Sequence, residues 1–110
     1  MMQTLLIKDI CCDKLGSILE QGATLVDVRE SDEFEKGTIP GAAHIALSEL
    51  PTSKEKVPLN KTLVLFCRSG RRSSKAAKIV SHWSKKQIFC LSGGYKAYCE
   101  YMSTENIEKK

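Results

Sequence analysis

The chain has 110 residues, which suits one domain of common size and is too short for two separate cores. Hydrophobic residues make up 42% and charged residues 27% of the sequence, a balance that excludes an intrinsically disordered protein. The formal net charge of +4 arises from 17 basic and 13 acidic residues spread along the chain. A charge of this size indicates solubility rather than a nucleic-acid-binding surface, so no nucleic-acid partner is predicted.

The N-terminal residues carry no apolar core of a signal peptide, and no run reaches the roughly 18 apolar residues of a membrane span. We therefore expect a cytoplasmic protein without a membrane partner. The five cysteines are an odd number and lack CxxC spacing, which argues against a disulfide framework and against a metal site. They are expected to be mostly free thiols.

Short apolar runs alternate with segments of helical spacing, and this alternation predicts an α/β domain with a mostly parallel sheet. Residues 4–7 are predicted to form the first strand, followed by a helix that ends near Gly22. Residues 24–28 are predicted to form a buried strand. Ser31 is then expected to cap a short helix that ends at Gly37.

The middle of the chain contains the segment most typical of a strand. Residues 42–45 are expected to be briefly extended, and a short helix over 48–50 is expected to be stopped by Pro51. Residues 52–60 are predicted to form a polar surface connection. Residues 62–66 are continuously apolar, which predicts a central parallel strand covered on both faces.

The last third is predicted to contain two helices and one strand. Apolar residues fall on one face of an amphipathic helix over 73–84, and a strand over 87–91 precedes a helix over 95–102. We predict that residues 1–103 form the domain and that residues 104–110 form a charged tail that frays.

The segment with the clearest chemical content joins the central strand to the amphipathic helix and reads Cys67-Arg68-Ser69-Gly70-Arg71-Arg72-Ser73. Backbone N–H groups of a tight loop that enters a helix converge on one point, and the helix N-terminus adds positive charge there. Such a loop forms a cradle for an anion. Gly70 allows the backbone angles that a turn of this kind needs.

A cysteine at the start of this cradle is a candidate nucleophile, because the N–H groups, the helix dipole and nearby arginines stabilise its thiolate. Cys67 occupies that position and is expected to face solvent. The other four cysteines have no such surroundings, and we interpret Cys11, Cys12, Cys90 and Cys99 as packing residues.

Three ordered segments resemble the single-domain members of the rhodanese-like sulfurtransferase family, over nearly the whole chain from about residue 6 to about residue 101. The first is Asp27-Val28-Arg29-Glu30 together with Glu33-Phe34 and Gly37-Thr38-Ile39-Pro40-Gly41-Ala42. The second is the Cys67 loop itself. The third is the turn Leu91-Ser92-Gly93-Gly94.

The resemblance implies a single rhodanese-like domain, a five-stranded, mostly parallel sheet with helices on both faces. It also implies that Cys67 is the catalytic residue and that it carries sulfur as a persulfide from an anionic donor such as thiosulfate to cyanide or a thiol acceptor. The implied substrate-binding residues are those that follow Cys67 in the loop: Arg68, Ser69, Gly70, Arg71, Arg72 and Ser73. No cofactor is implied, because backbone N–H groups hold the sulfur.

Asp27 and Arg29 match a pair that the family has near a strand end, and we interpret them as supporting residues that tie loops together by charge-assisted hydrogen bonds. Thr38 stands where the family usually has histidine. Tyr98 is expected to occupy the place of an aromatic residue, often tryptophan, that follows the Gly-Gly turn. His44 is more typical of a surface or core polar residue than of a catalytic base, and the same holds for His82.

Two other functions stay open at this point. Phosphatases and arsenate reductases of the same fold place arginine after cysteine and five residues, whereas only four residues separate Cys67 from Arg72. The shorter ring fits a single sulfur better than a tetrahedral oxyanion. A sulfur-relay or binding module with a protein partner is the second alternative. The loop arginines favour thiosulfate as donor, and Arg71 and Arg72 are expected to meet its sulfonate end.

Overall fold

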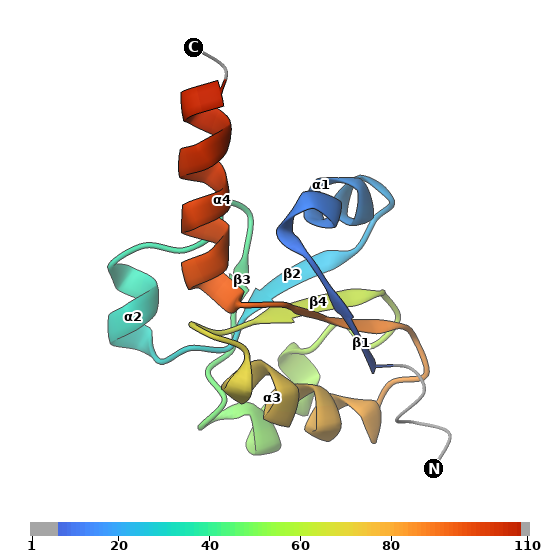
Figure 1. Cartoon of the computed structure of the whole chain (residues 1–110). Coiled ribbons are helices and arrows are strands. Elements are labelled where there is room, and N and C mark those ends of the chain that lie inside the picture. The colour runs from blue at the N-terminus through green and yellow to red at the C-terminus, as the bar shows by residue number, and fades with distance from the viewer. Residues whose placement is uncertain (1–6, 109–110) are drawn as a thin grey trace.

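Five parallel strands form the centre of the molecule, in the order β1-β5-β4-β2-β3 (Figure 1). The structure is a computed structural model and describes residues 7–108. The strands are β1 (Ile7–Ile10), β2 (Thr24–Asp27), β3 (Ala43–His44), β4 (Leu63–Phe66) and β5 (Ile88–Leu91). Their carboxyl ends meet at one edge of the sheet, where parallel α/β folds place their sites.

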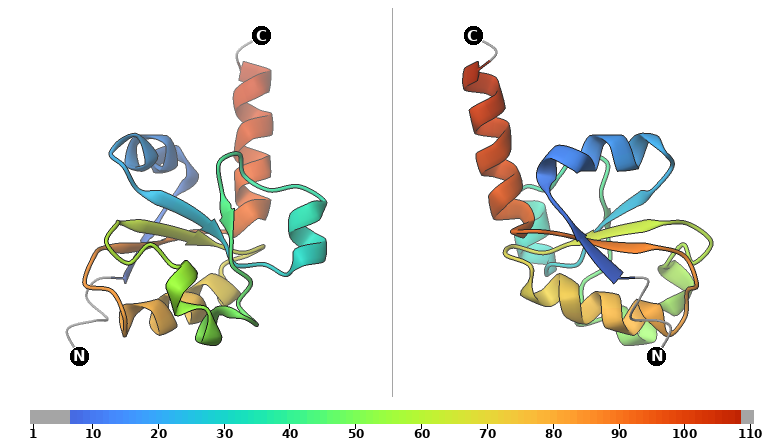
Figure 2. Two further views of the ribbon diagram at one scale, coloured as in Figure 1. Left: turned by 180° about the vertical axis from the view of Figure 1, so that it is seen from behind. Right: turned by 45° about the vertical axis from the view of Figure 1, so that its right-hand side comes forward.

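Helices cover both faces of this sheet, as predicted. They are α1 (Cys12–Glu20), α2 (Ser31–Glu35), α3 (Arg71–Ser81) and α4 (Gly94–Glu108), with the 3₁₀ helices η2 (Leu50–Thr52) and η3 (Lys54–Lys56). The views in Figures 1 and 2 place α1 and α4 on one side and α3 with the 3₁₀ helices on the other. The fold class predicted from the sequence is therefore confirmed.

The side chains of β4 explain why both faces are covered, since all four are buried. Leu63 and Leu65 pack into the cluster beneath α3, whereas Val64 and Phe66 pack into the cluster that contains Leu15 of α1. Successive side chains of a strand point to opposite faces, so a continuously apolar strand requires an apolar layer on each side.

Several predicted boundaries in the first half are wrong by a few residues. β1 begins at Ile7 and continues to Ile10, while residues 4–6 of the predicted strand lie outside the described residues. Glu30, not Ser31, precedes α2, and its N–H donates to the Glu33 carboxylate at 3.2 Å. A carboxylate that reaches back in this way satisfies an N–H that the helix leaves unpaired, so Ser31 becomes the first helical residue.

Pro51 does not stop the short helix predicted over 48–50, because it lies in the first turn of η2. Proline is tolerated there, since the first turn needs no N–H donor. The predicted polar connection after it is also only partly polar. Val57 is buried in the core beneath α3, so this segment contributes to packing.

Both C-terminal helices differ in length from the prediction. α3 begins at Arg71 rather than at residue 73 and ends at Ser81, because Gly70 adopts φ 117° and the helix starts directly after it. α4 runs from Gly94 to Glu108 and so includes residues 104–108, which the sequence suggested as a fraying tail. Over residues 7–108, no helix combines the length and apolarity that crossing a membrane would require.

Candidate active site

The loop after β4 wraps around the sulfur of Cys67. The backbone N–H of Gly70 donates to Cys67 Sγ at 3.0 Å, and that of Ser73 donates at 3.3 Å. The Ser73 hydroxyl donates to the Gly70 carbonyl at 3.1 Å, which holds the turn against the first turn of α3. Because Gly70 has φ 117°, a conformation that disfavours side chains, glycine is the residue that suits this position. The predicted N–H cradle is present.

Cys67 is buried, with 1% of its surface exposed, and the expectation that it faces solvent is therefore wrong. The reason is that the next six residues fold over its sulfur. Burial acts to raise the pKa of the thiol, but hydrogen bonds from the Ser73, Gly70 and Ser69 N–H groups outweigh it and lower the pKa from its ordinary value of 9.0. The cradle thus favours a thiolate.

The Arg72 side chain is paired rather than free. Its two terminal nitrogens donate to the two carboxylate oxygens of Glu33 at 2.7 and 2.9 Å, which links α3 to α2. This hydrogen-bonded pair holds the pKa of Glu33 down at about 2. Arg72 also lies near enough to Cys67 for a thiolate there to raise the pKa of the guanidinium. Arg68 and Arg71 are exposed.

Asp27 and Arg29 form a buried pair at the end of β2. Arg29 Nη2 donates to Asp27 at 2.7 Å and to the Gly37 carbonyl at 2.6 Å, while the Thr38 hydroxyl donates to Asp27 at 2.8 Å. The side chain of Arg29 is 5% exposed and that of Asp27 is 0% exposed. Thr38 thus ties the loop after α2 to the buried carboxylate. These contacts join the end of β2 to the loop after α2 by charge-assisted hydrogen bonds.

A family model covers most of the chain and identifies its family. The model of the rhodanese-like domain matches residues 12–101. The chain belongs to the rhodanese-like domain family. It is 40% identical over 76 residues to the uncharacterized protein YqhL of Bacillus subtilis, a match that covers 69% of this chain and 60% of YqhL. The chain thus spans less than two thirds of that relative.

Two further relatives are matched over nearly their whole length. The chain is 28% identical over 101 residues to the thiosulfate sulfurtransferase GlpE of Pseudomonas savastanoi, covering 92% of this chain and 95% of GlpE. The structure of the human single-domain sulfurtransferase TSTD1 superposes with a TM-score of 0.75 at 30% identity, covering 84% of this chain and 95% of that one. Both of these named sulfurtransferases are thus similar to this chain over most of its length.

The Gly93-Gly94 turn of this rhodanese-like domain sits directly against the cradle. Tyr95 N–H donates to the Cys67 carbonyl at 2.7 Å, and Lys96 N–H donates to the Arg68 carbonyl at 3.1 Å. A Cβ on Gly94 would collide with both carbonyl oxygens. The first turn of α4 therefore positions the loop through its backbone, which the sequence analysis did not predict.

Tyr95 is an aromatic residue next to the site that the sequence did not lead us to expect there. The Arg29 guanidinium lies 4.4 Å from the centre of the Tyr95 ring, close enough for a cation–π contact. The rings of Tyr95 and Tyr98 are stacked, with centres 6.3 Å apart. The signal that could have found Tyr95 is its place immediately after the Gly-Gly turn.

The remaining cysteines lie in other surroundings. Cys90 is buried in β5 with Sγ 3.7 Å from the Ser73 carbonyl, and burial raises its pKa to about 11. Burial also raises the pKa of Cys12, whereas Cys11 and Cys99 are exposed. A thiol with a raised pKa is a poor nucleophile at neutral pH.

Neither histidine contacts Cys67. His44 Nε2 donates to the Arg29 carbonyl at 2.7 Å, and its ring stacks on Phe34 with centres 4.4 Å apart. His82 is an exposed residue just after α3. Within the described residues, neither histidine is therefore placed to act as a base on the thiol.

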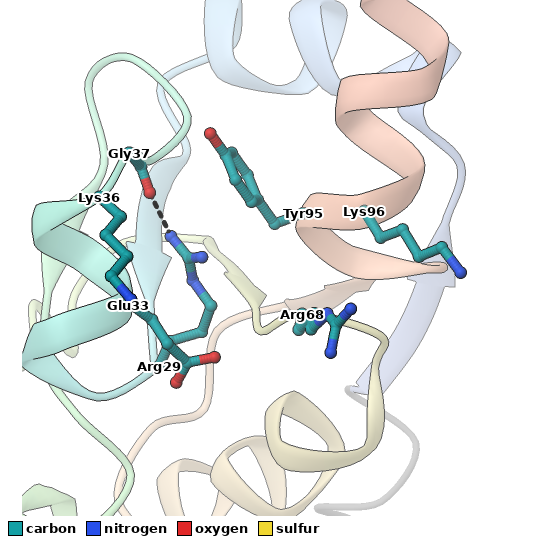
Figure 3. A pocket seen from close by; sticks show the side chains of 7 residues that line it. All are labelled: Arg29, Glu33, Lys36, Gly37, Arg68, Tyr95 and Lys96. Atoms are coloured by element: carbon teal, nitrogen blue, oxygen red, sulfur yellow. Dashed lines mark hydrogen bonds between the residues drawn. The ribbon is translucent and has the colours of Figure 1, made fainter.

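A pocket of about 380 Å³ opens beside the cradle and involves residues that the sequence analysis did not identify. Its lining is Arg29, Glu33, Lys36, Gly37, Arg68, Tyr95 and Lys96 (Figure 3). These residues come from the segment 29–37 around α2, from the Cys67 loop and from α4. They meet only because the sheet brings three segments far apart in sequence to one edge, so no local pattern could have indicated the pocket.

Proposed function

We propose that this rhodanese-like chain moves sulfane sulfur from thiosulfate to a thiol or to cyanide through a persulfide on Cys67. The observation that carries the proposal is the convergence of the Gly70 and Ser73 N–H groups on the Cys67 sulfur, at 3.0 and 3.3 Å. The name of GlpE supports thiosulfate as the donor, and the names of GlpE and TSTD1 both support sulfur transfer.

The proposed reaction has two half-reactions, and both use the same cradle. The Cys67 thiolate attacks the outer sulfur of thiosulfate, a new S–S bond forms, and the bond to the sulfonate sulfur breaks so that sulfite leaves with its electron pair. The acceptor then attacks the outer sulfur of the persulfide and returns Cys67 to the thiolate. The anion is on the cysteine sulfur in one state and on the outer sulfur in the other, so converging N–H groups stabilise both.

The other loop residues complete the proposed substrate site. Ser69 and Ser73 provide backbone donors to the sulfur together with Gly70. Arg68 and Arg71 are exposed beside the loop and are the proposed contacts for the sulfonate. Arg72 is proposed as a weaker contact, because its guanidinium is already bonded to Glu33. The proposed acceptor is a small thiol or cyanide, with a protein acceptor as the alternative.

The geometry favours sulfur transfer over phosphate chemistry. In a phosphatase cradle an arginine side chain must reach the bound oxyanion, and in this loop the residue that comes nearest to that position is Arg72. Glu33 engages both of its terminal nitrogens. The ion pair with Glu33 would have to break before the Arg72 guanidinium could form bidentate hydrogen bonds to a phosphate.

Intact mass after treatment with thiosulfate tests the proposal directly. The parent protein should gain one sulfur atom that a reductant removes, and peptide mapping should place this atom on Cys67. Cys67→Ala should gain none and should transfer no sulfur to cyanide. Cys90→Ala is the matched control, because it removes a buried thiol close to the same loop and should still load sulfur.

Because Cys67 is buried, its replacement by alanine leaves a small cavity, and circular dichroism should check that each variant is folded. A folded Cys67→Ala variant that still loads and transfers sulfur at the parent rate would show that another cysteine is the nucleophile. If the parent protein gains no sulfur after treatment with thiosulfate, thiosulfate is not the donor.

A further inference from the structure

The two signs of charge are separated in the second half of the chain. Although acidic and basic residues both occur along the sequence as a whole, no acidic residue lies between Glu55 and Glu100, which is two fifths of its length. The same stretch contains α3 and the connection to β5, which are rich in lysine and arginine. This part of the molecule therefore has an excess of positive charge.

Four exposed lysines of this stretch form what we call the α3 basic face: Lys75, Lys78, Lys85 and Lys86. The first two are three residues apart in α3, so they lie on the same side of the helix. The other side of α3, which includes Ala77 and Val80, packs into the core. Figures 1 and 2 show α3 on the opposite side of the sheet from α1 and α4, so the face is turned outward from that layer.

The lysines of the α3 basic face have no ion-pair partner in the part of the chain from residue 7 to residue 108. Asp9 of β1 and Glu55 of η3 lie on the same side of the sheet, but neither forms a salt bridge with the face. An acidic surface that approaches α3 would therefore gain attraction without first breaking an ion pair among the described residues.

The α3 basic face leads away from the cradle. Arg71 is the first residue of α3, and the Ser73 N–H in the same turn donates to Cys67 Sγ at 3.3 Å. Lys85 and Lys86 lie just before β5, at the opposite edge of the sheet. A molecule that binds along the face therefore has one end at the rim of the cradle.

The size of the face indicates a transient contact. The 11 residues of α3 give a helix about 17 Å long and about 10 Å wide, far less than the roughly 800 Å² per partner of a stable complex. Charged surfaces of this kind act mainly by steering an encounter and setting its orientation, and their effect weakens with salt.

The acidic helix α2 limits what can bind to this face. Asp32 and Glu35 of α2 are exposed, and the pair of Arg72 with Glu33 joins α2 to the cradle end of α3. A membrane or a nucleic acid carries negative charge over its whole surface and would meet this acidic helix as well. A protein can instead present a local acidic patch that matches α3 and avoids α2.

The side chains of α3 also favour a protein. Helices that bind membrane surfaces combine basic residues with exposed apolar ones, whereas the exposed residues of α3 are Arg71, Ser74, Lys75 and Lys78. The α3 basic face consists of lysines, which lack the planar guanidinium that pairs with phosphate groups through two hydrogen bonds.

We infer that the α3 basic face docks an acidic surface patch of a protein partner, in a transient contact that brings this partner to the rim of the cradle. The inference goes beyond the proposed function, because the docking depends on the charges of α3 and not on the sulfur chemistry of Cys67. It can therefore be tested in protein that carries no sulfur.

A capped oligoglutamate peptide long enough to span α3 is the probe for such an acidic surface. In an NMR titration at an ionic strength of about 0.1 M, it should shift the backbone signals of α3 and of residues 82–86 more than those of α1. Lys75→Gln/Lys78→Gln removes two charges and keeps polar side chains on the helix. This variant should bind the peptide about fivefold more weakly than the parent does, because two exposed contacts are lost.

The matched control is Lys8→Gln/Lys14→Gln, which lowers the net charge equally. Both lysines are exposed, Lys14 in α1 and Lys8 in β1, where it pairs with Phe89 on the face of the sheet that α1 covers. Binding to this control should stay within about twofold of the parent value, because charges more than about 10 Å away are largely screened. Raising the ionic strength to about 1 M should abolish binding to all three proteins, because the screening length falls to about 3 Å.

A DNA duplex and phosphatidylglycerol vesicles, titrated in the same way, distinguish the other polyanions. Neither should bind the parent more tightly than oligoglutamate does. Tighter binding of either one that is weakened in Lys75→Gln/Lys78→Gln would assign the face to a nucleic acid or to a lipid surface and overturn the inference. The inference also fails if oligoglutamate does not bind the parent, or if it binds the two double variants equally.

Discussion

Arg72→Ala and Glu33→Gln, made singly and together, measure the pair that ties α2 to the first turn of α3. Glutamine at position 33 can still accept the hydrogen bond that the Glu30 N–H donates at 3.2 Å, so this change removes the charge and leaves the start of α2 capped. The cycle of four proteins therefore isolates the interaction between the two charges.

The geometry sets the expected size of the coupling. Two hydrogen bonds of 2.7 and 2.9 Å join the side chains, which are 33% and 30% exposed. Isolated surface pairs contribute about 0.2 to 1 kcal/mol, and a two-pronged arginine–carboxylate pair with partial burial is stronger, so we expect a coupling of about 1 to 2 kcal/mol. The lowering of the Glu33 pKa to about 2 also shows that Arg72 stabilises the ionised carboxylate. Because both side chains are partly exposed, solvent screening keeps the coupling free energy well below the value that this pKa shift alone would suggest.

Thermal or urea unfolding of the four proteins gives this coupling. In a domain of this size, 1 kcal/mol corresponds to about 4 to 8 °C in Tm. The pH dependence has a definite sign, because the carboxyl of Glu33 has a lower pKa in the folded state than its ordinary value of 4.5. The stabilisation is complete above about pH 4.5 and is lost as the pH falls towards about 2.

The exposed pair of Lys56 and Glu49 is the matched control. A single contact of 3.3 Å joins these residues, which are 56% and 42% exposed, so its coupling should be near the lower limit for surface pairs. If the coupling of Arg72 with Glu33 is no larger than that of the control, or does not change between pH 7 and about pH 2, then the pair does not hold α2 against α3.

Three further outcomes are expected at the cradle. The rate of Cys67 alkylation, followed by peptide mapping as the pH is raised, should reach half of its maximum below pH 9.0. Cys90 should not react until the protein unfolds. If the midpoint for Cys67 is at or above that of a denatured control, the N–H donors do not stabilise the thiolate. Alanine at position 94 would have to adopt a positive φ of 60°, and its Cβ would collide with two carbonyl oxygens of the cradle. Gly94→Ala should therefore lower the free energy of unfolding by more than about 2 kcal/mol and slow sulfur loading. A neutral effect would mean that α4 does not position the loop. Arg71→Ala should raise the KM for thiosulfate about tenfold at low salt. Arg72→Ala should raise it less, because Arg72 is already bonded to Glu33. Equal effects of the two changes would show that the pair of Arg72 and Glu33 opens when thiosulfate binds.

The sequence by itself predicted the elements of the sheet and the loop that carries the chemistry. Residues 62–66 are apolar without interruption, and this is sufficient to indicate a strand buried on both faces, as β4 is. Cys67 and Gly70 follow at the point where the pattern changes from strand to helix, which indicates a cradle of N–H groups. Both the buried strand and the cradle of N–H groups depend on residues within a few positions of each other in the sequence.

Boundaries were less well predicted, because neighbouring residues compete for the same local role. Ser31 has the better side chain for capping, yet the reach of Glu33 back to the Glu30 N–H moves the start of α2 by one residue. In the same way Gly70, with its positive φ, starts α3 two residues before the apolar periodicity would place it. Differences of one or two residues in helix ends are set by energies of about 1 kcal/mol, which short patterns do not resolve.

Only the tertiary structure decided what surrounds Cys67. The sequence indicated an exposed thiol near free arginines, whereas the folded chain buries the sulfur and bonds Arg72 to Glu33, a residue 39 positions away. The pocket that brings Gly37 and Tyr95 to one space is equally invisible along the chain. Parallel strands need long crossovers, so the groups gathered at their carboxyl ends are distant in sequence, and their partners are chosen by packing rather than by local pattern.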